Sequence, residues 1–202
     1  MPRFLAVFLF LFIPFPSPSQ ETQKRILFRS DSTWYAADDQ LLFSSNDKGV
    51  SWDTIFAKKS PADTVFFYGA LDTATNVFIS DAKTLFVFGW DGTMHYKTIL
   101  FCSSDYGKTW NKHIFPGNSG SLGTKYLHKI NADQFFLDCR KGDYYLTSDT
   151  GKTWIRHTMI KQKNTSADEH FTFHKNGDIT FEYLEGKKRS RDGGNTWETI
   201  SN

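Results

Sequence analysis

The fold is decided by the stretch Ser103-Ser104-Asp105-Tyr106-Gly107-Lys108-Thr109-Trp110, which follows the pattern Ser/Thr-x-Asp-x-Gly-x-Thr/Ser-Trp. The other three copies are Ser45-Asn46-Asp47-Lys48-Gly49-Val50-Ser51-Trp52, Thr147-Ser148-Asp149-Thr150-Gly151-Lys152-Thr153-Trp154 and Ser190-Arg191-Asp192-Gly193-Gly194-Asn195-Thr196-Trp197. Their aspartates lie 58, 44 and 43 residues apart. One match to so short a pattern is weak, but four matches, two at nearly equal spacing, indicate a chain built from four repeated units.

Each copy carries the residues that a tight turn between two strands requires. The aspartate accepts backbone N–H groups, the glycine takes a positive φ, and the tryptophan covers the turn with its ring. The sequence therefore assigns a structural turn role to Asp47, Gly49, Trp52, Asp105, Gly107, Trp110, Asp149, Gly151, Trp154, Asp192, Gly194 and Trp197. The alternative is a set of calcium sites, but each copy supplies one acid where calcium needs several oxygens, so no metal or cofactor is expected.

Short strand-like runs surround each turn. They cover residues 25–30, 33–37, 41–45 and 51–56 in the first unit, 125–130, 134–139, 144–148 and 153–158 in the third, and 171–175, 179–184, 187–190 and 196–200 in the fourth. No segment has a sustained apolar period of 3.6, so almost no helix is expected. Four-stranded units of this length predict an all-β β-propeller of four antiparallel blades, over residues 25–57, 64–115, 125–160 and 170–201.

Two aspects of the architecture stay open at this point. The first strand of the long second unit lies within either residues 64–70 or residues 76–80, followed by strands within 84–90 and 94–104 around the turn Asp91-Gly92-Thr93. The last unit ends near Asn202 with no strand left to exchange with the first. The blades therefore form either a closed ring or an open arc that associates with itself or a partner, or they belong to a longer propeller.

The first 19 residues predict a signal peptide. Arg3 supplies a positive charge, residues 4–15 are almost all apolar, and Ser17-Pro18-Ser19 places small residues before a cleavage site at Gln20. The alternative is an uncleaved anchor, but about twelve apolar residues are too short to span a bilayer core of ~30 Å. We expect a secreted or periplasmic domain over residues 20–202 with no membrane association after cleavage.

Charge and composition narrow the possible partners. A net charge of +2 gives no electrostatic basis for binding nucleic acid. The basic run Lys187-Lys188-Arg189-Ser190-Arg191 is interpreted as an edge strand protected by charge. Aromatic residues make up 17% of the chain, and those outside the turns, such as Phe66-Phe67-Tyr68, Trp90 and Tyr144-Tyr145, either bind a partner or, as we expect, pack between blades.

Cys102 and Cys139 are expected to be free, buried thiols. Cys102 falls at the turn end of one blade, and Cys139 at the opposite end of the next. Strands of five or six residues separate such ends by about 15–20 Å. A disulfide tolerates roughly 7 Å between Cα atoms.

The four turns resemble the Asp-box, or bacterial neuraminidase (BNR), repeat found in sialidases, sortilin-type receptors, some glycoside hydrolases and photosystem II assembly factors. The stretch Trp34-Tyr35-Ala36-Ala37-Asp38 before Leu41-Leu42-Phe43-Ser44 is most similar to the assembly-factor type. In these proteins the boxes are structural and lie at the blade periphery. The resemblance therefore implies a fold and leaves the ligand open.

A sialidase resemblance implies an Arg-Ile-Pro strand, two further arginines that clamp a carboxylate, and six blades. Here Arg25-Ile26-Leu27 lacks the proline, and the other arginines of the mature chain are Arg29, Arg140, Arg156, Arg189 and Arg191. Paired acids such as Asp38-Asp39 or Glu182 with Glu185 are interpreted as exposed turn residues. The sequence favours a non-catalytic scaffold that binds a protein or glycan through blade loops, with no catalytic residues assigned. The alternative is a sialidase-like or other glycoside hydrolase in which Arg25 binds substrate.

Overall fold

The computed structural model describes residues 24–58, 65, 71–90, 97–115, 122–139, 142–159 and 169–200. These residues form sixteen strands in four sheets. The first two blades contain β1 (Arg25–Arg29), β2 (Trp34–Ala37), β3 (Leu41–Ser45) and β4 (Asp53–Ala57), then β5 (Val77–Ile79), β6 (Leu85–Trp90), β7 (Thr98–Ser103) and β8 (Asn111–Phe115). The last two contain β9 (Leu127–Lys129), β10 (Phe135–Asp138), β11 (Asp143–Thr147) and β12 (Ile155–Thr158), then β13 (His170–Phe173), β14 (Ile179–Tyr183), β15 (Gly186–Ser190) and β16 (Glu198–Ile200).

Every blade is an antiparallel sheet whose strand order follows the chain. The helical structure within the described ranges is one 3-10 turn, η1 (Thr124–Tyr126). Each repeated turn joins the third and fourth strands of its blade. The prediction of an all-β propeller with four four-stranded blades is therefore confirmed.

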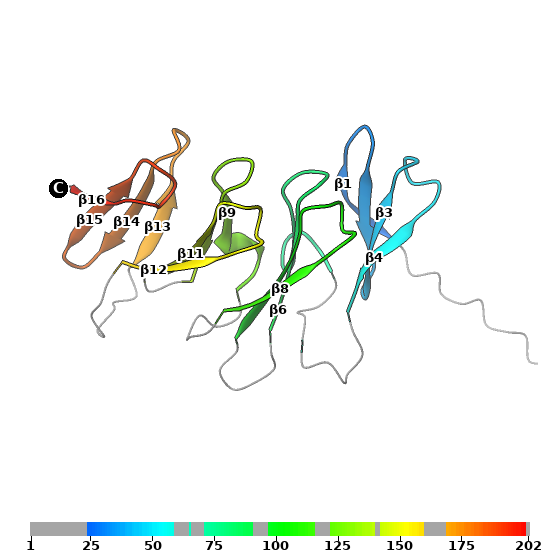
Figure 1. Ribbon diagram of the computed structural model, residues 1–202, viewed down its shortest axis with the longest axis horizontal. Coiled ribbons are helices and arrows are strands. Elements are labelled where there is room, and N and C mark those ends of the chain that lie inside the picture. Colours follow the sequence, from blue (N-terminus) through cyan, green and yellow to red (C-terminus); the bar gives the residue numbers. More distant parts are fainter. Residues whose placement is uncertain are drawn as a thin grey trace, which may run out of the picture.

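The four blades lie side by side in a row, with the first and the fourth at opposite ends (Figure 1). Three apolar cores hold the row together, and each core lies between two consecutive blades. One contains Tyr35, Leu42, Val77 and Leu85, the next Phe86, Leu100, Phe135 and Leu137, and the last Phe136, Tyr144, Leu146 and Ile179. Of the three arrangements that the sequence left open, the closed ring is not the one that the described residues form (Figure 1), because the first and fourth blades share none of these cores.

Aromatic rings make up much of the contact between blades. Phe86 of the second blade meets Phe135 of the third edge-on, with ring centroids 4.8 Å apart. Tyr144, expected to pack between blades, is 1% exposed, and Tyr145 is 7% exposed. Phe66-Phe67-Tyr68 lies outside the described residues. Edge-to-face pairs of this kind add stabilisation beyond the apolar area that they bury.

The structure identifies the first strand of the second blade and contradicts the prediction made for the basic run at residues 187–191. The first strand is β5, within the alternative at residues 76–80, whereas the alternative at 64–70 lies outside the described residues apart from Val65. The basic run was expected on an edge strand, and this is wrong. Its first four residues, 187–190, lie in β15, which pairs with β14 and β16 on its two sides, and Arg191 follows the strand.

Other expectations concern the thiols and the N-terminus. Both thiols are free and buried, as predicted: Cys102 lies in β7, and Cys139 follows β10. Residues 1–19, the expected signal peptide, lie outside the described residues, as do Asp91-Gly92-Thr93 and Arg140. No helix in the described ranges is long and apolar enough to cross a membrane.

Candidate functional site

The four repeated turns share one hydrogen-bond pattern centred on the aspartate. In the third copy, Asp149 accepts the Thr153 N–H at 2.9 Å and the hydroxyls of Thr153 and Thr147 at 2.6 and 2.7 Å. The Thr147 hydroxyl in turn accepts the Gly151 N–H at 2.9 Å. Asp47, Asp105 and Asp192 make the same set of bonds. Each carboxylate is therefore used within its own turn.

These bonds keep the aspartates ionised. Hydrogen bonds from Ser51, followed by one from Ser45, lower the pKa of Asp47 to about 2. Burial opposes ionisation of Asp105 and Asp149, but hydrogen bonds from Thr109 and Thr153 outweigh it, so their pKa values also lie below the ordinary range. A carboxylate that accepts several hydrogen bonds is stabilised in its charged form.

The glycines of the last three turns press against the preceding blade. A Cβ placed on Gly107 would meet Ile55, one on Gly151 would meet Phe86 and Cys102, and one on Gly194 would meet Phe136, all within 3.0 Å. The Trp110 indole donates to the Gly107 carbonyl and also to the carbonyl of Ile55, one blade earlier. These turns thus join neighbouring blades as well as neighbouring strands.

The third tryptophan departs from the pattern. Trp52, Trp110 and Trp197 each donate the indole N–H to the glycine carbonyl of their own turn. The Trp154 indole N–H makes no hydrogen bond of ordinary geometry to protein and lies beside the Cys102 thiol. Burial raises the pKa of that thiol, so Cys102 is protonated and held under the third turn.

A groove of about 730 Å³ opens between the second and third blades, on the side where the repeated turns lie. Its walls are the second and third repeated turns together with the β5–β6 and β9–β10 turns. The lining consists of charged, hydroxyl and amide side chains and one alanine: Asp81, Lys83, Thr84, Ser104, Asp105, Thr109, Asn111, Ala132, Asp133, Asp149, Thr150 and Lys152. A surface of this kind recognises its ligand through charge and hydrogen bonds.

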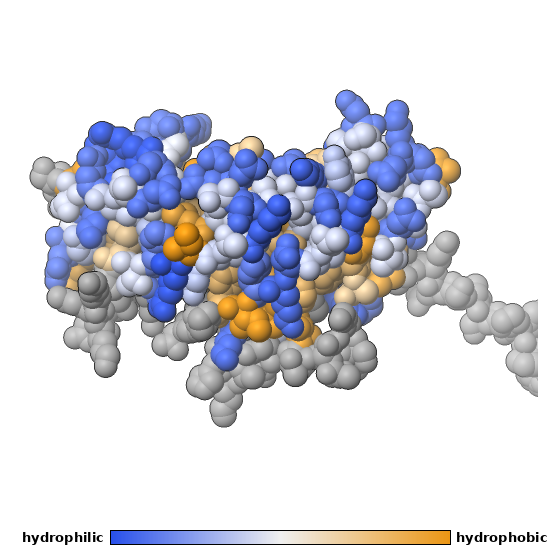
Figure 2. Space-filling view, viewed as in Figure 1, coloured by the Kyte–Doolittle hydropathy of each residue, from blue (hydrophilic) through white to orange (hydrophobic). Residues whose placement is uncertain are grey.

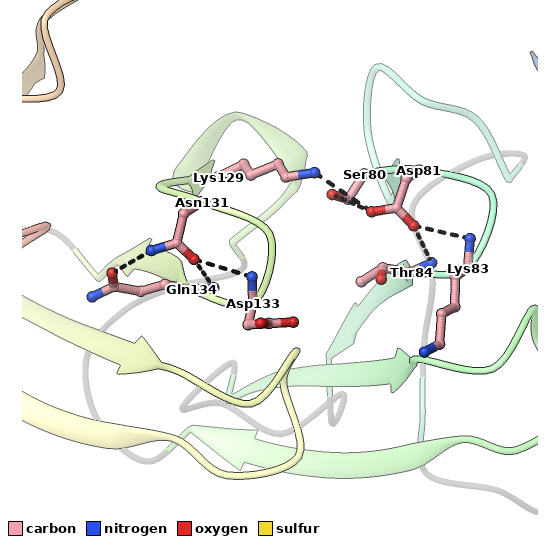
Figure 3. Close-up of polar contacts among 8 residues, drawn as sticks. All are labelled: Ser80, Asp81, Lys83, Thr84, Lys129, Asn131, Asp133 and Gln134. Atoms are coloured by element: carbon pink, nitrogen blue, oxygen red, sulfur yellow. Dashed lines mark hydrogen bonds and ion pairs between the residues drawn. The ribbon is translucent and has the colours of Figure 1, made fainter.

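Figure 3 shows the two hairpin turns that form one end of this groove. Asp81 accepts the N–H groups of Lys83 and Thr84 at 2.9 Å each, and Asn131 does the same for the β9–β10 turn at 3.0 and 2.9 Å. Lys129 of the third blade reaches Asp81 of the second at 3.4 Å. Burial alone would raise the pKa of Asp81. The hydrogen bonds from the Lys83 and Thr84 N–H groups and the charge of Lys129 outweigh burial, so the pKa of Asp81 lies below its ordinary value.

Three charges remain available to a ligand. Asp81, Asp105 and Asp149 accept hydrogen bonds from their own turns, whereas Lys83, Lys152 and Asp133 form no ion pair within the described residues. Sequence reasoning missed these three residues. Asp81 and Asn131 mark the turns, since both stand four residues before the second strand of a blade, but the distance between two turns depends on blade packing.

The described arginines do not converge on one site. Arg25 donates to the Leu71 carbonyl at 3.2 Å and lies 3.9 Å from Asp39. Arg29 lies over the Trp34 ring, and Arg156 pairs with Asp143 in the third blade. Arg189 and Arg191 both contact Glu198 in the fourth. Within the described residues, three or more His, Cys, Asp or Glu side chains nowhere come together as a possible metal site.

Four antiparallel four-stranded blades, packed face to face along the chain, define a protein of the β-propeller class. The model of the Sortilin-Vps10 family, described as "Sortilin, neurotensin receptor 3", matches residues 98–202, just over half of the chain. The chain therefore belongs to the Sortilin-Vps10 family. No curated protein shows significant sequence similarity to it.

Several solved structures are similar over most of the chain. YCF48 bound to D1 peptide is 18% identical with a TM-score of 0.43, over 89% of this chain and 55% of that one. YCF48 from Cyanidioschyzon merolae is 13% identical with a TM-score of 0.41, over 89% and 57%. The GH74 xyloglucanase from Xanthomonas campestris is 15% identical with a TM-score of 0.49, over 87% and 30%. The chain thus spans little more than half the length of the YCF48 chains and under a third of the xyloglucanase.

Proposed function

We propose that this protein is a non-catalytic propeller scaffold of the Asp-box type, which binds a protein partner in the groove between its second and third blades. The observation that carries the proposal is the division of charges in that groove. The carboxylates of Asp105 and Asp149 hold their own turns, whereas Lys83, Lys152 and Asp133 are exposed and form no ion pair with another described residue. A partner with two carboxylates and one cation satisfies the three free charges.

The state of the carboxyl groups supports binding over hydrolysis. A glycoside hydrolase needs one carboxylic acid whose pKa is raised so that it can protonate the leaving group. The pKa values of Asp81, Asp105 and Asp149 in the groove, and those of Asp47, Glu182 and Asp192 elsewhere, all lie below their ordinary values, so none of these groups is such an acid. The described residues that line the groove also include no aromatic side chain, and a lining of charged and polar groups favours a polypeptide over a neutral glycan.

A synthetic peptide array tests the proposal. Peptides in which two carboxylates and one basic residue are placed at varied spacing are probed with purified protein, and the tightest binders are measured by fluorescence anisotropy. We expect the variant K83E/K152E to lose about tenfold or more in affinity, because two attractions become repulsions. The control K108E/K175E reverses two exposed lysines outside the groove and keeps the affinity.

Two results contradict the proposal. One is equal binding of acidic and neutral peptides, or equal loss in both variants. The other is turnover of a fluorogenic sialoside or another glycoside that Arg25→Ala abolishes, since this makes the protein an enzyme.

We further propose that the mature chain is exported after cleavage before Gln20. The support is the charge, apolar length and small residues of the first 19 positions. N-terminal sequencing of protein recovered from the medium or periplasm tests this proposal. A protein that keeps Met1, or that stays with the cytoplasmic fraction, contradicts it.

A further inference from the structure

Each blade has two faces, and the strand register identifies equivalent positions on them. The leading face points toward the preceding blade, and the trailing face points toward the following one. Trp34, Leu85, Phe135 and Ile179 are equivalent leading-face residues, because each pairs with the Ser or Thr that stands two residues before the box aspartate. Leu85, Phe135 and Ile179 lie in the three cores between blades.

The trailing face is mostly apolar in the first three blades and charged in the fourth. At two positions of the third strand, the first three blades carry Leu42 and Ser44, Leu100 and Cys102, and Tyr144 and Leu146, whereas the fourth carries Lys187 and Arg189. Lys187 pairs with Glu182, and Arg189 with Glu198 at 2.9 Å. Lys187 and Arg189 line a shallow hollow of about 500 Å³ together with His174, Lys175 and Thr180.

This charged face ends the row of blades. Packing an apolar blade on it would remove Lys187 and Arg189 from water, and buried charges are costly unless they gain complete new partners. Terminal units of repeat proteins commonly carry such a polar outer face. Hydrophilic colouring predominates on the visible side of the molecule, which has only separate hydrophobic areas (Figure 2).

The leading face of the first blade is different, because its residues are of the kind that fill the three cores. Ile26, Trp34, Ala36 and Phe43 occupy the positions of Val77, Leu85, Val87 and Phe101 in the second blade. Ile26 is 39% exposed where the equivalent Val77 is fully buried, and Trp34 is half-buried where Leu85 is fully buried. Ala36 and Phe43 are already buried, at 0% and 7% exposed, so Ile26 and Trp34 are the side chains of this set that a partner can still cover. A Cβ on Gly49 would meet Trp34 and Trp52 of its own blade, whereas the other three box glycines meet a preceding blade. Lys24 and Arg29 lie over the Phe43 and Trp34 rings.

The interface between the second and third blades indicates the charge of the partner. Arg29 is equivalent to Lys129, since Arg29 pairs with Trp34 and Lys129 with Phe135. Lys129 binds Asp81 of the preceding blade at 3.4 Å. In the fourth blade Lys175 stands at the position of Asp81, the second residue of the five-residue turn before the second strand. If the fourth blade packed on the first, Lys175 would therefore lie next to Arg29, and the two positive charges would repel each other.

We propose that the leading face of the first blade is a docking surface for a different protein, which covers it with an apolar sheet face and places a carboxylate on Arg29. The fourth blade cannot supply this partner face, either within one chain or from a second copy. This surface is separate from the groove between the second and third blades, so either proposal can fail alone.

The test gives the trailing face of the fourth blade the carboxylate and the apolar side chains that it lacks. The variant K175D/K187Y/R189L copies Asp81, Tyr144 and Leu146 onto its trailing face. A new apolar patch that fits a surface elsewhere on the same molecule produces rings or head-to-tail assemblies. We expect the wild type to stay monomeric in sedimentation, and the variant either to at least double its mass or, if the ring closes, to shrink in radius of gyration by X-ray scattering.

Second-site changes identify the surface. Adding I26K should abolish either response, and adding R29E should weaken it. The variant K187Y/R189L/R29E keeps Lys175. It should recover association, because Lys175 can pair with the new carboxylate at position 29. The control K108Y/K125L/K112D makes the same kinds of substitution at exposed sites away from both end faces and should stay monomeric. Circular dichroism confirms that each variant is folded.

The remaining outcomes overturn the proposal. A folded triple variant with the mass and radius of the wild type excludes the docking surface. Association that I26K does not affect places the contact elsewhere. Association that I26K abolishes but R29E leaves unchanged excludes the carboxylate on Arg29, and a wild type that self-associates through Ile26 excludes the different partner.

Discussion

Replacing Gly194 with alanine tests how the repeated turns join neighbouring blades. Gly194 has φ +94°, and a Cβ there would lie 2.9 Å from Cε2 and 3.0 Å from Cδ2 of Phe136 in the preceding blade. The Phe136 ring cannot move aside easily. It is fully buried, stacks on Tyr144 with centroids 4.5 Å apart, and meets the Phe171 ring at 5.0 Å.

Gly177 provides the matched control for this change. Its φ is +90°, but a Cβ placed there has nothing within 4 Å. The strain of a positive φ costs alanine about 1–2 kcal/mol at either position, and overpacking a core adds about 1–3 kcal/mol at Gly194 alone.

The measurement is the free energy of unfolding by urea titration, with the melting temperature as a second readout. We expect Gly194→Ala to be less stable than Gly177→Ala by about 1–3 kcal/mol, or roughly 3–10 °C in melting temperature. Equal losses in the two variants would falsify the view that the box glycine is required for contact with the preceding blade.

Three further predictions concern the turns, the acid stability and the thiols. Asp149→Ala should lower the free energy of unfolding by about 1–2 kcal/mol through lost turn hydrogen bonds, and Asp133→Ala, an acid in the same groove, should not; equal effects contradict the structural role of the box. The pKa of His128 is lowered to about 4 by burial against Phe173, so the unfolded chain takes up protons first, and stability should fall as pH drops from about 6.5 to 4. The lowered pKa of Asp47, about 2, means that its contribution is present above about pH 4 and lost as pH falls through 2. Urea titrations at a series of pH values should show the free energy of unfolding fall in both pH ranges. In His128→Gln the fall between about pH 6.5 and 4 should be smaller, and an unchanged fall in that range refutes the assignment to His128. Cys102 and Cys139 should resist a thiol reagent in the folded protein and both react in denaturant; a single or no reactive thiol after denaturation refutes the free-thiol state.

The repeated turn made the blades predictable because its chemistry is local. A carboxylate, a hydroxyl and a glycine at fixed spacing select one turn conformation, and the strands on its two sides must then be antiparallel neighbours. The box copies at Asp47 and Asp192 predict strands that end at Ser45 and Ser190, where β3 and β15 end. The second blade was less clear, since the residues before β5 do not alternate.

The groove could not be predicted in the same way. Its free charges, Lys83, Asp133 and Lys152, lie in three turns up to 69 residues apart in sequence. They come together only because the cores between blades set the distance from one sheet to the next. Nothing local distinguishes these residues from other exposed lysines and aspartates.

The basic run at residues 187–191 was wrongly predicted to lie on an edge strand, although the sequence contains the pattern that shows which face its charges occupy. Charged residues at alternate positions of a strand were interpreted as protection of an edge, which assumes that an interior strand is covered on both faces. In the fourth blade the strand is interior to its sheet, but among the described residues no further blade covers one of its faces. The alternation is visible in the sequence, where Ile179 and Phe181 alternate with Thr180 and Glu182, and these two sets point to opposite faces. Once the box serine fixes the register, the polar set falls on the trailing face, so the sequence itself distinguishes this face from the trailing faces of the first three blades.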